Sequence, residues 1–163
     1  HALIQIFLAN TDVGNVRFWK APNTKWRWVL YDMDLSMRKI EDDTIKRLLN
    51  PPRDNLYPSD LLSSVLTNKT LRSRFIERTA VLAQTTFTSE RIQSELSRMT
   101  TLIEEELQAD RARWGYPFDM WEAAIEDIKT FSARRQTALS AHYRKHFRLS
   151  ASELSMLFPE ATP

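Results

Sequence analysis

Cysteine is absent from the 163-residue sequence, and glycine occurs only as Gly14 and Gly115. Without cysteine, the chain cannot form disulfides, perform thiol chemistry or bind zinc through thiolates. Two isolated glycines cannot build the glycine-rich phosphate loop of a Walker-type or kinase-type nucleotide site. The same scarcity favours a helix-rich fold, because turn-rich β folds need glycine where φ is positive.

Long apolar runs are also missing. The first run, Ala2 to Ala9, is interrupted by Gln5, and it is too short to span a bilayer. It lacks a basic leader, so it is not a complete signal peptide. Lys and Arg total 23 against 21 Asp and Glu, a balance that gives no general case for binding nucleic acid. The 42% hydrophobic and 27% charged residues are ordinary for a one-domain globular protein.

The most informative stretch covers residues 10–37, which read NTDVGNVRFWKAPNTKWRWVLYDMDLSM. Two short apolar runs, 16–19 and 26–31, are separated by turn-forming residues at 21–24. This pattern predicts an antiparallel β-hairpin over residues 15–31. Both of its faces carry bulky side chains, so we expect the ribbon to be covered on both sides.

Polar side chains stand at both open ends of this hairpin. Asp12 and Asn15 precede the first strand, and Asp32 and Asp34 follow the second. Because antiparallel strands bring their far ends together, we expect these side chains to lie close to one another. Oxygen ligands suit Mg²⁺ or Ca²⁺ rather than zinc, and Mg²⁺ commonly completes its shell with phosphates and water. The alternative is that these residues only cap turns, as Asn and Asp often do.

This stretch resembles the signature region of the CotH kinase family, the spore coat protein H-like atypical kinases. The matching motifs are Asn10-x-Asp12-x-x-Asn15 and Trp28-x-x-Tyr31-Asp32-x-Asp34-Leu35. The similarity continues into the helical remainder, at Arg113-Trp114-Gly115, Trp121, Phe131 and Arg134-Arg135.

The resemblance implies a mainly α (α+β) fold: a helical domain like a kinase C-lobe, with an N-terminal β-hairpin. It also implies that Asp12 is the catalytic carboxylate, that Asn15 and Asp32 bind the metal–nucleotide cofactor, and that Asp34 is a further metal ligand. Ordinary kinases place the Asn five residues after the catalytic Asp and a His-Arg pair before it. Here Asn15 follows by three, and Asn10-Thr11 stands in the place of His-Arg.

The function implied by the resemblance is transfer of phosphate from ATP, bound with Mg²⁺ or Mn²⁺, to protein hydroxyls. The chain begins with His1 rather than Met, so we expect an amino-terminal lobe that embraces ATP to be missing. The fragment alone is then expected to be inactive. The partners implied are a protein substrate or a coat or surface protein, in a spore coat, secreted or cell-surface location, without nucleic acid or a membrane-spanning segment.

Two other functions remain open from the sequence. The first is a non-catalytic module of the same fold, used as a structural or cell-surface interaction domain. The second is a two-carboxylate metal hydrolase that acts on phosphoesters or sugars. The hydrolase ranks last, because acids on one hairpin leave no evident base or nucleophile.

The remaining pattern divides the chain into one domain over 1–150 and a short C-terminal helix and tail over 150–163. Within the domain we expect a polar, irregular connection over 37–60, containing one helical turn at 45–49, and then a helical bundle over 59–147. The expected helix boundaries lie at Asp60, Thr67 or Asn68, Thr88 or Ser89, Gly115, Asp119 and a Ser150/Glu153 capping box.

Several side chains outside the motif need an interpretation. We expect Trp19, Trp26 and Trp28 to form core or a lid under the hairpin, and Glu104 to Glu106 to be a solvated face. Arg135 falls near an apolar stripe, where it either pairs with a buried carboxylate or extends to the surface. His142 and His146 share a helix face at zinc-compatible spacing, but without a third ligand we interpret them as surface histidines.

Overall fold

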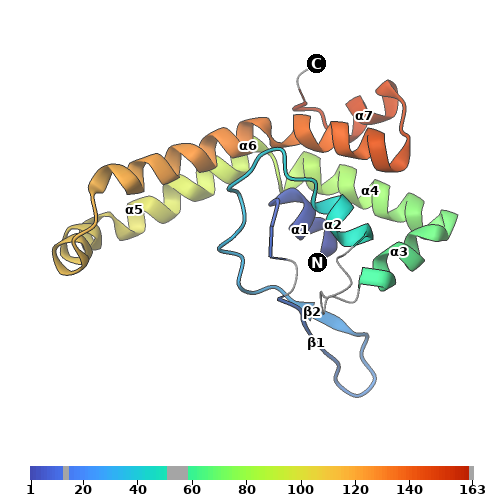
Figure 1. Cartoon of the computed structure of the whole chain (residues 1–163), viewed down its shortest axis with the longest axis horizontal. Helices are drawn as coiled ribbons and strands as arrows, with labels where there is room; N and C mark the ends of the chain where they lie inside the picture. Colours follow the sequence, from blue (N-terminus) through green and yellow to red (C-terminus); the bar gives the residue numbers. More distant parts are fainter. Residues whose placement is uncertain (13–14, 51–58, 162–163) are drawn as a thin grey trace.

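The computed structural model describes residues 1–12, 15–50 and 59–161. Helices dominate it, and one antiparallel hairpin precedes most of them, which confirms the predicted mainly α (α+β) fold (Figure 1). The elements are α1 (Ala2–Phe7), β1 (Arg17–Trp19), β2 (Arg27–Val29), α2 (Thr44–Leu49), α3 (Ser59–Thr67), α4 (Lys69–Thr85), α5 (Ser89–Trp114), α6 (Phe118–Phe147) and α7 (Ala151–Leu157).

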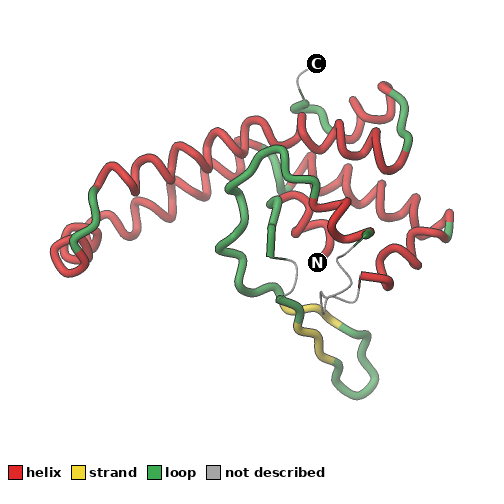
Figure 2. The backbone as a smooth tube through the Cα atoms, in the orientation of Figure 1, coloured by secondary structure: helices red, strands yellow, loops and turns green. Residues whose placement is uncertain are grey.

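The helices surround α1, and two parts extend from them. Helices α5 and α6 form a long antiparallel arm, and the hairpin projects from another side of the helical body (Figures 1 and 2). Helix α4 packs against α3 and α7, while α2 packs against α1, α3 and α6. The expected helical turn at 45–49 is confirmed as α2, but Pro51, Pro52 and Pro58 lie outside the described residues.

The core fixes α1 against the C-terminal half of the chain. Ile6 and Phe7 of α1 are buried in one apolar cluster with Tyr143 of α6 and Phe158 after α7. The ring of Phe7 also stacks on Phe87, with centroids 4.4 Å apart. Burying such side chains contributes on the order of 2 kcal/mol each. The short first helix is therefore held by tertiary packing, since six residues are too few for an isolated helix.

Most of the predicted helix boundaries are confirmed, but α3 begins at Ser59, so Asp60 lies in its first turn rather than at its cap. Asn68 and Thr88 cap α4 and α5 by accepting the N–H groups of the residues three positions on. Gly115 ends α5 in the left-handed region, with a φ of 71°. Ser150 and Glu153 form the expected capping box of α7.

The predicted cap of α6 is wrong. Asp119 lies inside the first turn, and Pro117 is the residue at the cap. The Asp119 carboxylate accepts the N–H of Met120 at 3.0 Å. The helix begins earlier because proline has a fixed φ that suits a helix start and has no N–H to satisfy.

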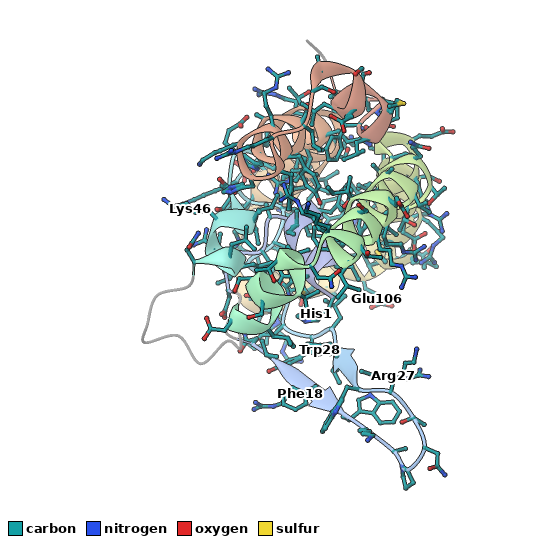
Figure 3. All side chains as sticks on the ribbon, turned by 90° about the vertical axis from the view of Figure 1, so that its right-hand side faces the viewer. His1, Phe18, Arg27, Trp28, Lys46 and Glu106 are labelled. Atoms are coloured by element: carbon teal, nitrogen blue, oxygen red, sulfur yellow. The ribbon has the colours of Figure 1, made fainter. Side chains whose placement is uncertain are left out.

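The hairpin forms in the predicted place, but the expectation that it is covered on both sides is wrong. Phe18 pairs with Trp28 across the strands, and Pro22-Asn23 forms the turn, with Asn23 at a φ of 60°. Trp19 and Trp26 are 48% and 57% exposed, so neither is core, and Trp28 is only partly buried. The aromatic rings pack on one another instead, beyond the reach of the helices (Figure 3).

In the part of the chain that the structure describes, no helix combines the length and apolar character needed to cross a membrane. Glu104, Glu105 and Glu106 are exposed on the α5 arm, as expected of a solvated face.

Candidate functional site

The C-terminal end of α1 sets the direction in which the following loop leaves the helix. Ala9 adopts a φ of 51°, the left-handed conformation that usually ends helices. The N–H of Ala9 donates to Ile6 O at 3.3 Å, and the N–H of Asn10 donates to Gln5 O at 3.0 Å. These two bonds form a Schellman motif with alanine in the position where glycine is usual. The chain therefore leaves the buried helix sharply, and the next residues form the loop that carries Asp12.

The structure brings Asp12, Asn15 and Asp32 together, as the hairpin predicts. The Nδ2 of Asn15 donates to Asp12 Oδ2 at 2.8 Å and to Asp32 Oδ2 at 2.7 Å. One amide thus bridges two carboxylates that lie twenty residues apart in the sequence. The side chains from the two open ends of the hairpin share one small volume.

Asp34 lies beside this group and acts on it electrostatically. The pKa of the Asp32 carboxyl lies above its ordinary value, because it is partly desolvated, because Asp34 is a hydrogen-bonded like charge, and because Asp12 is also near. Asp32 also has a φ of 54°, which is unusual outside glycine, though Asp tolerates it better than most residues. Backbone strain of this kind is common at functional sites.

The donor set suits a hard divalent cation. Carboxylates of Asp12, Asp32 and Asp34 and the amide oxygen of Asn15 are the ligand types of Mg²⁺ and Mn²⁺. A cation among them would relieve the repulsion that raises the pKa of Asp32. Among residues 1–12, 15–50 and 59–161, no group of three or more Asp, Glu, His or Cys side chains is already arranged to hold a metal ion.

Arg135 of α6 fixes the helix that precedes the site. This side chain is 3% exposed, and its guanidinium donates to the main-chain carbonyl oxygens of Phe7 at 3.0 Å and Ile6 at 2.5 Å. It also donates to the carbonyl oxygens of Ile40 and Asp42 in the segment after the hairpin. Neither alternative left open by the sequence is correct, because Arg135 bonds main-chain carbonyls rather than a carboxylate or solvent.

A second contact between α6 and this segment involves histidine. His146 Nε2 lies 2.8 Å from Asp43 Oδ2, and Lys145 donates to the same oxygen at 3.1 Å. Partial burial alone would raise the pKa of Asp43, but hydrogen bonds from His146, the Lys46 N–H and Lys145 lower it to about 2. Asp43 also caps α2 by accepting the Lys46 N–H.

The expectation that His142 and His146 are surface histidines is wrong. The side chain of His146 is 12% exposed and pairs with Asp43. His142 is partly buried, and burial lowers its pKa. Helical spacing alone could not show this, because the partner comes from a segment about a hundred residues away.

A cavity of about 580 Å³ opens beside the site. Its lining includes Thr11 and Leu35, the neighbours of Asp12 and Asp34 in the sequence. The other lining residues are Arg38, Lys39, Glu41, Asp42, Asp43 and Arg47. The lining therefore carries side chains of both charges, with Arg47 paired to Asp42 at 2.5 Å.

Sequence reasoning missed the residues that support the loops. Asn10 was part of the motif, but its burial was not predicted. No pattern marked Gln5 as its hydrogen-bond partner, or Asp43 as the partner of His146. The one available signal was Asn10 itself, a polar residue directly after an apolar helix and two positions before Asp12.

Comparison with known protein families gives a match over most of the chain. The family model described as CotH kinase protein matches residues 2–139 of the 163-residue chain, a range that includes α1, the hairpin, the acidic group and most of α6. Neither the curated proteins nor the solved structures gave a match. Because the matched range covers most of the sequence, the chain belongs to the CotH kinase family.

Proposed function

We propose that this chain is the catalytic, helical portion of an atypical protein kinase that transfers phosphate from ATP to protein hydroxyls. The observation that carries the proposal is the bridge formed by Asn15 between Asp12 and Asp32. This bridge supports the proposal because Asp12, Asn15 and Asp32, the residues of the family motif, lie within hydrogen-bond distance where two loops meet. Family membership supports the proposed reaction class, and the geometry supports the proposed choice of residues.

Each side chain has a separate task in this proposal. Asp12 accepts a hydrogen bond from the acceptor hydroxyl, orients its oxygen for attack and takes its proton. Asp32 and Asn15, with Asp34 beside them, hold Mg²⁺ or Mn²⁺. When bound, the cation neutralises charge on the phosphates of ATP. In the structure the Asn15 NH₂ group bonds both carboxylates and holds Asp12 and Asp32 together. To bind the cation, the amide would turn its oxygen toward it.

The exposed hairpin is the surface that would face an ATP-embracing lobe. Its aromatic side chains are uncovered, with Phe18 53% exposed and Trp26 57% exposed. Residues 16–31 include Arg17, Lys20, Lys25 and Arg27 but no acidic residue. The strands lead directly to Asn15 and Asp32, so a lobe seated here would lie over the acidic group. We propose that this lobe belongs to the same protein and that the fragment alone does not turn over ATP.

The cavity beside Thr11 and Leu35 is the seat proposed for the acceptor segment. Its lining includes Thr11 and Leu35, which are the sequence neighbours of Asp12 and Asp34. Arg38 and Lys39 of its lining are exposed, as is Glu41. These three charged side chains would pair with charged or polar side chains of the acceptor segment.

The test measures transfer of labelled phosphate from ATP to a protein acceptor by the complete gene product. Asp12→Asn and Asp32→Asn keep the size of each side chain but remove its charge. We expect each to lower the rate at least about a hundredfold while the fold is retained. Glu104→Gln, which removes a charge from the exposed face of α5, is the control. Undiminished transfer by either Asp variant would remove the proposed mechanism.

A further inference from the structure

Asn10 is a buried polar residue between the two loops that carry the acidic group. It is 1% exposed, and it follows the sharp end of α1. A buried amide is costly unless its donors and acceptor are satisfied, so its contacts show what it holds in place.

Its first contacts are with the main chain of Asp12. The Asn10 Oδ1 accepts the N–H of Asp12 at 3.2 Å, and the Asn10 Nδ2 donates to Asp12 O at 2.8 Å. The orientation of the amide is fixed, because a main-chain N–H can only donate and a carbonyl can only accept. The peptide groups on both sides of the Asp12 side chain are therefore held by one residue.

Its other contacts extend to the second loop and to α1. The Nδ2 of Asn10 lies 3.7 Å from the sulfur of Met33, the residue between Asp32 and Asp34. The same nitrogen donates to Gln5 Oε1 at 2.6 Å, which anchors it to the buried helix. Asn10 thus contacts both halves of the site without contacting the carboxylates themselves.

We propose that Asn10 is a positioning residue that sets the separation of Asp12 from Asp32. It holds the main chain of one loop and the Met33 side chain of the other, from an anchor on α1. This inference deepens the proposed function and rests on it for its catalytic consequence. Its structural consequence, the bridge through Asn15, can be measured independently of activity.

The variants Asn10→Ala and Asn10→Ser remove the amide, and the serine retains a small hydroxyl in case the alanine variant does not fold. Thr44→Val is the matched control. Thr44 is fully buried, and its hydroxyl donates to the main-chain oxygen of Asn10 at 3.5 Å. The Thr44→Val substitution removes this neighbouring buried hydrogen bond but leaves the Asn10 side chain and its contacts in place.

The first readout is the NMR signal of the Asn15 side-chain NH₂ in the 163-residue chain. In the wild type this group donates to two carboxylates, so its protons should be displaced from those of a free amide. We expect both Asn10 variants to move the signal toward free-amide values, and Thr44→Val to leave it unchanged. The second readout is Mn²⁺ affinity, which we expect the Asn10 variants to weaken about 10- to 100-fold, as outer-shell substitutions do.

Two results would overturn the inference. One is an Asn15 signal that stays at its wild-type position in a folded Asn10 variant. The other is an equal displacement in Thr44→Val, which would show that any loss of stability disturbs the bridge. If the wild type binds no Mn²⁺, the proposed function fails at the metal, while the Asn15 signal still decides the role of Asn10.

Discussion

At the residue scale, Arg135 connects segments that are far apart in the sequence. Its guanidinium satisfies carbonyl oxygens at the end of α1 and in the segment after the hairpin. Burial lowers its pKa to about 10, against the opposing effect of the Asp42, Glu41 and Asp43 carboxylates, so it remains charged at neutral pH. The loop that carries Asp12 therefore begins at a helix end that the buried guanidinium of Arg135 holds in place.

Arg135→Met tests this role. It keeps the apolar stem but removes every donor, and it leaves the buried carbonyls without their partner. We expect the free energy of unfolding to fall by at least about 3 kcal/mol. Urea denaturation measures the change, with Arg134→Met on the exposed face of the same helix as the control, expected within about 0.5 kcal/mol of the wild type. Similar losses for the two variants would contradict a special role for Arg135.

The residues of the acidic group could be predicted from the sequence, but their supports could not. Two strands joined by a short turn bring Asp12 and Asp32 together whatever the rest of the chain does. Arg135 and Phe7 are 128 positions apart, so no local pattern can reveal their contact. The same limit applies to Asn10, which is buried beside Met33 and Thr44, 23 and 34 positions away.

At the element scale, α2 joins the segment after the hairpin to α6. Asp43 caps this helix and also pairs with His146 and Lys145, so one carboxylate serves both contacts. Because its pKa is about 2 in the fold, against an ordinary 3.8, Asp43 stabilises the protein above about pH 4. That contribution is lost as the pH falls from about 4 to about 2.

Asp43→Asn should remove this pH-dependent contribution. Asparagine can still cap the helix, but it cannot form the ion pairs. The difference between the ordinary pKa of 3.8 and the pKa of about 2 in the fold corresponds to roughly 2 kcal/mol of folding stability at neutral pH. Denaturation at pH 7 and at pH 2 measures this contribution. The exposed Glu41→Gln is the control for charge alone. If Asp43→Asn were as stable as the wild type at pH 7, the pairing with α6 would contribute nothing.

The elements themselves were largely predictable, because caps and turns depend on local chemistry. Asn68, Thr88, Gly115 and Ser150 mark the helix boundaries in the structure as they do in the sequence. The surroundings of the hairpin were not predictable. A β-ribbon with bulky side chains on both faces has the same sequence pattern in two situations. It can be buried, or it can project into solvent with its rings packed on one another.

At the scale of the whole molecule, the helical body acts as a frame for the acidic group. The core fixes α1 against α6, Arg135 and Asp43 fix the segment after the hairpin to the same helix, and the hairpin joins the two loops. The site therefore lies where the projecting hairpin joins the helical body (Figure 1). The cavity lined by Thr11 and Leu35 opens beside it.

The most direct test of the proposed site is to locate Mn²⁺ on the 163-residue chain by paramagnetic broadening of its NMR signals. This method detects weak binding, so it does not require ATP or a second lobe. We expect low concentrations of Mn²⁺ to broaden the signals of Asp12, Asn15, Asp32 and Asp34 first, and Asp32→Asn to abolish that selectivity. Broadening that begins instead at the exposed Glu104–Glu106 face, with no effect at Asp12 and Asp32, would contradict a shared cation site.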